Sequence, residues 1–229
     1  MDFFLDTASI ESIKSFQDFG LVDGVTTNPA LLAQEGQEPL RQLKEIAAMV
    51  AGPVSAQVVE TDPERIIKHA QKLARVADNI VVKIPASTAG LLAAQALRAE
   101  GIKLLVTLNV HAVQTIPFIR MGVDYVAVFV GRLDAAKLDS TSLTWDTRRV
   151  IDQLNSPTKL MAASLRTPDH LTNAVAAGIH VATVSPAFWN QVFANPIFTS
   201  VEREFLQSWQ QLPQELRRGY ESWDDEEAG

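Results

Sequence analysis

The chain has 229 residues, 47% of them apolar, which is enough to bury the core of one large globular domain. It contains no cysteine, and this excludes disulfides, a thiolate nucleophile and a metal site with cysteine ligands. The formal charge of −7 includes four consecutive acids at Asp224–Glu227, so the rest of the chain is nearly balanced and we expect no nucleic-acid partner.

The sequence also lacks the features of a membrane protein. The first six residues carry two acids and no basic leader, and no apolar run approaches the ~18 residues of a membrane span. We therefore expect a cytoplasmic protein that has no membrane partner.

Short β-rich segments alternate with longer stretches of helical periodicity. The predicted strands are residues 2–6, 22–26, 54–58, 79–84, 102–107, 124–130, 158–163 and 179–184. The segments at 79–84 and 124–130 are almost continuously apolar, as expected of parallel strands that are buried on both faces. Amphipathic helices are predicted between the strands, most clearly at 38–50 and at 87–100.

Eight strand and helix units in about 200 residues predict a single (β/α)8 barrel, a TIM barrel of the α/β class. A doubly wound open sheet is the alternative fold. The glycine-rich nucleotide-binding motifs G-x-G-x-x-G and Walker A, which are typical of such sheets, do not occur in the sequence. We therefore favour the barrel.

A further helix is predicted at 197–212, beyond what an eight-unit barrel requires. Its apolar stripe consists of Ile197, Val201, Phe205, Leu206 and Trp209. Such a stripe could cover the helices of its own barrel or those of a neighbouring subunit. We place the barrel and this helix in residues 1–212, and an acidic, flexible tail in residues 213–229.

Lys83 is the first candidate catalytic residue, because catalytic groups of such barrels stand at the C-terminal ends of the strands. It interrupts the apolar segment 79–84 near its end. A lysine in that place could extend its amine into solvent, or it could take part in catalysis. Burial disfavours the ammonium form, and a neutral amine can attack a carbonyl to form a Schiff base.

Polar side chains also stand at the ends of the other predicted strands. They are Asp6, Thr26, Thr27, Asn28, Gln57, Thr107, Arg132, Asp134, Ser164, Arg166 and Ser185. Taken singly, several could be helix caps, as Asn28 before Pro29. Taken together on one rim with a buried lysine, they favour a site for a polyhydroxylated ligand. Arg132 and Arg166 would clamp a phosphate there, with surface salt bridges as the alternative.

Five motifs follow one another between residues 3 and 168. They are FLDT at 4–7, GVTTNP at 24–29, IVVKIP at 80–85, FVGRLD at 129–134 and AASLRTP at 162–168. In this combination the sequence resembles the short form of the transaldolase and fructose-6-phosphate aldolase family.

The resemblance implies a set of roles. Lys83 would form the Schiff base, Asp6 would assist proton transfer, and Asn28 would hold the dihydroxyacetone portion of the substrate. Arg132, Ser164 and Arg166 would bind the phosphate of a sugar phosphate. The family uses neither a metal nor an organic cofactor, and it forms homo-oligomers, pentamers or decamers, in which a C-terminal helix can cross onto a neighbour.

Two positions depart from the family pattern. Transaldolases of the family carry a glutamate on the third strand, where this chain has Gln57, as the aldolases do. The aldolases use a tyrosine near the end of the sixth strand, where this chain has Phe129, as transaldolases do. We expect Asp6 to move the proton, with Gln57 and Thr107 positioning a water, and His111 is an alternative. Thr26 and Phe129 are predicted to contact the substrate.

We therefore predict a class I aldolase that cleaves or forms the C3–C4 bond of a ketose phosphate. The expected reaction converts fructose 6-phosphate to dihydroxyacetone and glyceraldehyde 3-phosphate, because Gln57 cannot replace the carboxylate of the transfer enzymes. The alternative is a transaldolase that passes the dihydroxyacetone unit to an aldose phosphate. A phosphosugar isomerase or epimerase would instead need a carboxylate or histidine base without a covalent lysine. A barrel retained for binding or assembly is the non-enzymatic alternative.

Overall fold

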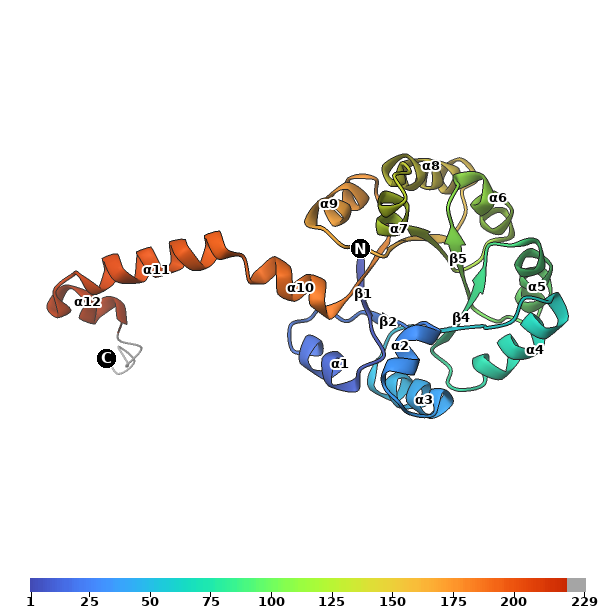
Figure 1. Ribbon diagram of the computed structural model, residues 1–229, viewed down its shortest axis with the longest axis horizontal. Helices are drawn as coiled ribbons and strands as arrows, with labels where there is room; N and C mark the ends of the chain where they lie inside the picture. The colour runs from blue at the N-terminus through green and yellow to red at the C-terminus, as the bar shows by residue number, and fades with distance from the viewer. Residues whose placement is uncertain (222–229) are drawn as a thin grey trace, which may run out of the picture. The chain divides into compact units, whose positions relative to one another are not determined.

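The structure, a computed structural model, describes residues 1–221 and contains a closed barrel of eight parallel strands (Figure 1). The strands are β1 (Asp2–Asp6), β2 (Gly24–Thr26), β3 (Val54–Gln57), β4 (Ile80–Pro85), β5 (Leu104–Asn109), β6 (Tyr125–Phe129), β7 (Lys159–Ala163) and β8 (Val181–Val184). Each strand pairs with the next along the chain, and β8 returns to β1, with Phe4 opposite Thr183. The predicted TIM barrel is confirmed, and the open sheet is excluded.

Helices alternate with the strands and surround the barrel (Figure 1). They are α1 (Ile10–Gln17), α2 (Pro29–Gln34), α3 (Pro39–Met49), α4 (Pro63–Ala74), α5 (Thr88–Ala99), α6 (Ala112–Met121), α7 (Val130–Ala135), α8 (Ser140–Gln153) and α9 (Pro168–Ala176). The helices predicted at 38–50 and 87–100 correspond to α3 and α5. Several begin with proline after a residue whose side chain accepts backbone hydrogen bonds, as Asn28 does before α2.

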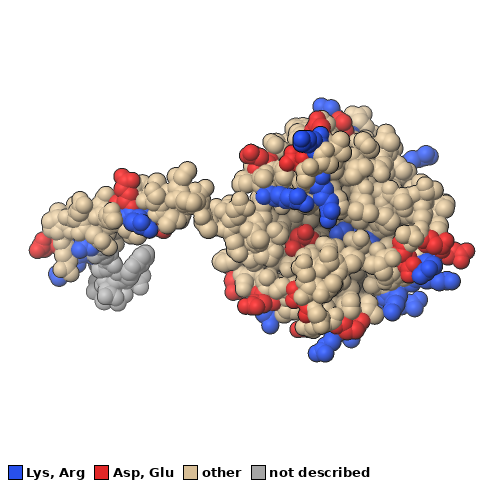
Figure 2. Space-filling model, viewed as in Figure 1, with Lys and Arg blue, Asp and Glu red and all other residues tan. Residues whose placement is uncertain are grey.

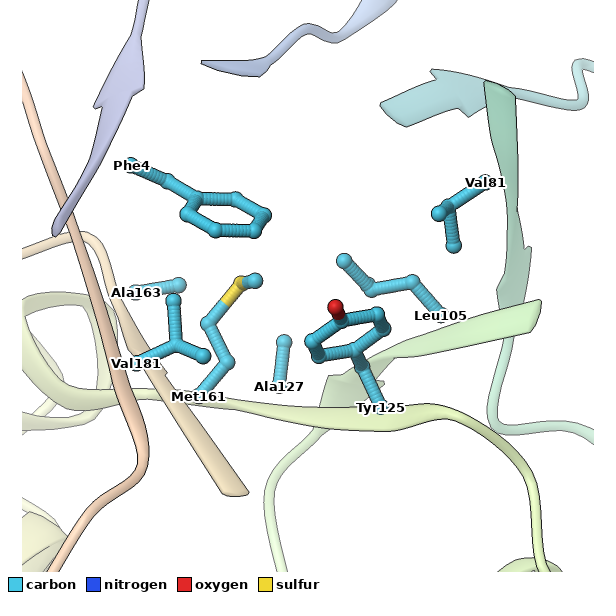
Figure 3. Close-up of a cluster of buried hydrophobic side chains, with 8 residues drawn as sticks. All are labelled: Phe4, Val81, Leu105, Tyr125, Ala127, Met161, Ala163 and Val181. Atoms are coloured by element: carbon cyan, nitrogen blue, oxygen red, sulfur yellow. The ribbon is translucent and has the colours of Figure 1, made fainter. Parts of the chain in front are cut away.

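The interior of the barrel is filled by side chains that point inward from six strands (Figure 3). The cluster consists of Phe4, Val81, Leu105, Tyr125, Ala127, Met161, Ala163 and Val181, all of them buried. Phe129 packs against it and is only partly buried. The barrel is therefore a packed core and not a pore, which leaves the C-terminal ends of the strands as the place for a site.

The chain divides into two compact units, residues 1–189 and residues 190–229. α10 (Pro186–Phe193) follows β8, and α11 (Pro196–Gln210) corresponds to the helix predicted at 197–212. α12 (Gln214–Glu221) lies within the segment predicted as an acidic tail, and residues 222–229 of that segment lie outside the described residues. None of the helices in residues 1–221 combines the length and apolar character needed to cross a membrane.

Candidate active site

A cavity of 580 Å³ opens at the C-terminal ends of the strands. Ten residues are predicted from the sequence to act in catalysis or substrate binding, and all but Thr107 and Arg166 line this cavity. The eight that do are Asp6, Thr26, Asn28, Gln57, Lys83, Phe129, Arg132 and Ser164. In the end-on view of Figure 2, both basic and acidic side chains appear around the centre of the barrel. The parallel, closed sheet brings these residues together because every strand ends on the same rim.

Lys83 is buried inside the barrel wall. It stands between two fully buried neighbours, Val82 and Ile84, and is itself 7% exposed. Its Nζ donates to the carbonyl oxygen of Thr27 at 3.3 Å. Burial lowers the pKa of Lys83, and this effect outweighs the opposing charge of Asp6. A larger fraction of the amine is therefore neutral, which is the form that attacks a carbonyl.

Asp6 is the acidic group that faces Lys83. Its Oδ1 accepts a hydrogen bond from the hydroxyl of Thr26 at 2.8 Å. Burial raises the pKa of Asp6, while the charge of Lys83 and the bond from Thr26 act in the opposite direction. Burial thus favours the neutral form of both groups, whereas the charge on each group favours the ionised form of the other. A carboxyl group in this balance can both take up and release a proton close to the nucleophile.

Strand β5 contributes to the rim in an irregular way. Leu108 has a positive φ of 65°, and the pairing of β5 with β6 shifts between Val106 and Asn109. A bulge of this kind redirects a side chain, and Leu108 lines the cavity while Thr107 is fully buried beside it. The hydroxyl of Thr107 has no hydrogen-bond partner among the described residues. The structure therefore does not place Thr107 on the cavity wall.

The loops after β6 and β7 meet at one point. The backbone N–H of Gly131 donates to the carbonyl oxygen of Ser164 at 3.0 Å, and a Cβ added to Gly131 would lie 2.2 Å from that oxygen. Arg132 lines the cavity, and its guanidinium lies over the ring of Phe129, 5.6 Å from the centroid. Arg166 is exposed, and its side chain packs near Gly131 without lining the cavity.

Other predicted residues serve local structure. The side chain of Ser185 accepts a hydrogen bond from the backbone N–H of Phe188 at the start of α10. His111 is exposed at the start of α6 and does not line the cavity. Asp134 is exposed and contacts His170, with 3.3 Å between the carboxylate and Nε2. Within residues 1–221, no three His, Asp or Glu side chains cluster in a way that could hold a metal ion.

Several residues that line the cavity were not predicted from the sequence. They are Pro29, Ala30, Leu108, Val110, Ala127, Leu133, Ala136, Leu138, Met161, Ala163 and Thr183. Thr183 could have been predicted, because alternation along β8 turns its side chain inward. The position of the Leu108 side chain depends on a positive φ, which is not predictable from the presence of a leucine.

Comparison with known proteins decides the family. The family model described as Transaldolase/Fructose-6-phosphate aldolase matches residues 3–222. The chain belongs to this family.

Several relatives match nearly end to end. A protein named probable transaldolase from Bartonella tribocorum is 41% identical over 216 residues, which cover 94% of this chain and 100% of the relative. One of the same name from Geotalea uraniireducens is 38% identical over 213 residues, 93% of this chain and 100% of the relative. Another, from Methanococcus maripaludis, is 40% identical over 210 residues, 92% of this chain and 98% of the relative.

Membership of the transaldolase family confirms the resemblance carried by the five motifs. It makes the chain an enzyme of the Schiff-base aldolase type, and it implies sugar phosphates as the substrate class. The reaction predicted from the sequence was the release of dihydroxyacetone, whereas these relatives are named probable transaldolases.

Proposed function

We propose that this protein is a transaldolase, which takes a dihydroxyacetone unit from a ketose phosphate and passes it to an aldose phosphate. The observation that carries the choice is the nearly full-length similarity to relatives named probable transaldolase. Phe129 supports it, because the cavity offers a phenyl ring where the aldolases of the family carry a phenol. This proposal replaces the release of dihydroxyacetone to water that Gln57 had favoured.

The reaction begins at Lys83. Its neutral amine adds to the carbonyl carbon of the ketose phosphate, and loss of water gives a protonated Schiff base. Asp6 then removes the proton from the C4 hydroxyl, and the electrons of the C3–C4 bond move into the Schiff base to form an enamine. The aldose phosphate leaves, a second aldose phosphate enters, and the enamine carbon adds to its aldehyde. Asp6 returns the proton, and water releases the new ketose phosphate from Lys83.

Binding of both partners uses the polar rim. Asn28 and Thr26 line the side of the cavity near Asp6, where the dihydroxyacetone unit would lie. Arg132 and Ser164 line it at the loops after β6 and β7, and they are the groups that would hold a phosphate. Arg166 stands beside this pair, so we assign it a weaker part in phosphate binding.

The proposal is tested with fructose 6-phosphate, with and without an aldose phosphate acceptor. We expect borohydride to trap an adduct that peptide mass mapping places on Lys83, and Lys83→Ala to fold without forming it. Lys103→Ala is the matched control, since Lys103 is exposed and precedes β5 at the opposite end of the barrel. Transfer product should exceed free dihydroxyacetone when acceptor is present. An adduct on another lysine would refute the role of Lys83, and equal release with and without acceptor would refute transfer.

A further inference from the structure

Three side chains form a line of hydroxyl and carboxyl groups across the seam where the barrel closes. Asp6 ends β1, Thr26 ends β2, and Thr183 lies in β8, the other neighbour of β1. The hydroxyl of Thr26 donates to Oδ1 of Asp6 at 2.8 Å, and the hydroxyl oxygens of Thr26 and Thr183 are 2.5 Å apart. All three residues line the cavity, while Thr26 and Thr183 are 1% and 3% exposed.

The count of hydrogens fixes the direction of this line when Asp6 is ionised. A carboxylate can only accept, and a threonine hydroxyl has a single hydrogen to donate. Thr26 gives its hydrogen to Asp6, so its contact with Thr183 requires that Thr183 be the donor. The chain therefore runs from Thr183 to Thr26 to Asp6, with every hydrogen pointing toward the carboxylate.

We propose that Thr183 is a positioning residue for proton transfer, whose hydroxyl acts through Thr26 to hold the carboxylate of Asp6 in its ionised, proton-accepting form. The inference rests on the proposed function, which gives Asp6 the proton of the C4 hydroxyl. It adds a residue of β8 to that function. None of the five motifs and none of the family roles named above includes a residue of β8.

The electrostatic surroundings explain why Asp6 needs this support. Burial is the largest influence on the pKa of Asp6 and raises it, so that the ionised form is disfavoured. The strands that flank β1, with sequences GVT in β2 and VATV in β8, contain no ionisable side chain. Lys83, across the barrel, is the charged group that lowers the pKa of Asp6. Hydrogen bonds to a carboxylate also favour its ionised form, and donors in series strengthen one another.

Removal of the Thr183 hydroxyl should therefore act on Asp6 through Thr26. In Thr183→Val the shape of the side chain is kept and the hydroxyl donor is lost. The Thr26 oxygen then no longer accepts a hydrogen bond from residue 183, and the hydrogen bond that Thr26 donates to Asp6 becomes weaker. The pKa of Asp6 then rises, and a higher pH is needed before the carboxylate can accept a proton. A residue that only packed the barrel would not give this result, because valine fills the same space.

The test is the dependence of kcat on pH, measured for transfer from fructose 6-phosphate to an aldose phosphate. We expect the acidic limb of the profile to move to higher pH by about one unit in Thr183→Val, a tenfold change in an ionisation constant, while Thr183→Ser keeps the parent profile. Thr144→Val is the matched control. It removes another buried hydroxyl, which donates to the carbonyl of Ser140 in α8 away from this cavity, and should leave the limb in place.

A double-mutant cycle connects the effect to Asp6. With the carboxylate replaced in Asp6→Asn, the further change Thr183→Val should have no effect on the remaining rate. If Thr183→Val does not fold, Thr183→Cys supplies a weak donor of similar size and should move the limb part of the way. An unmoved limb in the folded variant, or a serine variant that behaves like valine, would overturn the inference. A parent enzyme without an adduct on Lys83 would instead refute the proposed function.

Discussion

Phe129 and Gln57 are the two side chains that separate this active site from either usual form of the family. Phe129 has no proton to give, and its ring supports the guanidinium of Arg132. Gln57 ends β3 directly opposite Lys83 of β4 in the register of the two strands, and it also lines the cavity. An amide there can orient a water by hydrogen bonds but cannot exchange a proton with it. We therefore assign proton transfer in the parent enzyme to Asp6.

Restoring an acid/base group at either position should change the product ratio. Phe129→Tyr supplies a phenol within the cavity, so release of dihydroxyacetone from fructose 6-phosphate should increase. Gln57→Glu supplies a carboxylate beside Lys83, so transfer to an acceptor should increase instead. A proton-transfer group typically contributes a factor of ~10² to 10⁴ in rate. We expect changes at the lower end of this range, because Asp6 is already proposed to transfer the proton in the parent enzyme.

The measurement is the ratio of free dihydroxyacetone to transfer product for the parent and both variants. Phe129→Leu is the control, because it removes the ring that supports Arg132 without adding a phenol. If neither Phe129→Tyr nor Gln57→Glu moves the ratio, proton transfer does not depend on these two positions.

At the level of single residues, the sequence predicted those with an unusual chemical character for their place. Lys83 was found because a charge inside an apolar strand is costly, and Asp6 and Gln57 because polar residues end apolar strands. Thr183 was missed because threonine is an ordinary residue of a strand. Alternation along β8 could have placed it on the inward face, but the part its hydroxyl plays is visible only in the contact with Thr26.

Among the elements, the loops after β6 and β7 are the pair whose contact shapes the proposed phosphate site. Ser164 has a positive φ of 61°, an unusual conformation for a residue other than glycine. The hydrogen bond from the N–H of Gly131 to the Ser164 carbonyl holds this turn against the first residues of α7. Arg132 follows directly, so its direction depends on how closely the two loops approach each other.

Gly131→Ala should separate these loops. The new Cβ would lie 2.2 Å from the Ser164 carbonyl oxygen, which is backbone and cannot move aside alone. We expect the free energy of unfolding to fall by about 1–3 kcal/mol, measured by denaturant titration, because overpacking forces the backbone to shift. KM for phosphorylated substrates should rise at the same time.

Gly219→Ala in α12 is the control for this substitution, because a Cβ there meets no atom of residues 1–221 within 4 Å. It should leave both the unfolding midpoint and KM close to those of the parent. A Gly131→Ala protein as stable as the parent would show that the two loops can part without cost.

The elements themselves could be predicted well, since all eight predicted strands overlap observed ones. Apolar runs with short β-branched stretches are specific to buried parallel strands, and proline after a capping residue marks the start of several helices. The end of β5 was predicted at residue 107, whereas the strand continues to Asn109. The bulge at Leu108 explains the difference, because it breaks the alternation from which the end of a strand is judged.

At the scale of the whole molecule, the described part of the second unit carries large apolar side chains that are exposed. No residue of α11 is buried, and its large apolar side chains include Ile197 at 74%, Phe198 at 60%, Phe205 at 69% and Leu206 at 55% exposure. A contiguous apolar face of this kind is characteristic of a surface that packs against another protein. We therefore retain the prediction that α11 packs on a neighbouring subunit in a ring-shaped homo-oligomer, a pentamer or decamer.

Truncation after Asn195 should lower the molar mass of the particles in light scattering, because it removes α11 and its apolar face. Truncation after Glu221 is the matched control, since it removes only residues 222–229 with their four acids and should leave the assembly intact. Phe205→Asp, which places a charge on the same face of the full-length chain, should reproduce the loss of mass, since burial of an unpaired carboxylate at an interface is unfavourable. A full-length protein that is monomeric at micromolar concentration would contradict the prediction. So would a chain ending at Asn195 that still assembles like the parent.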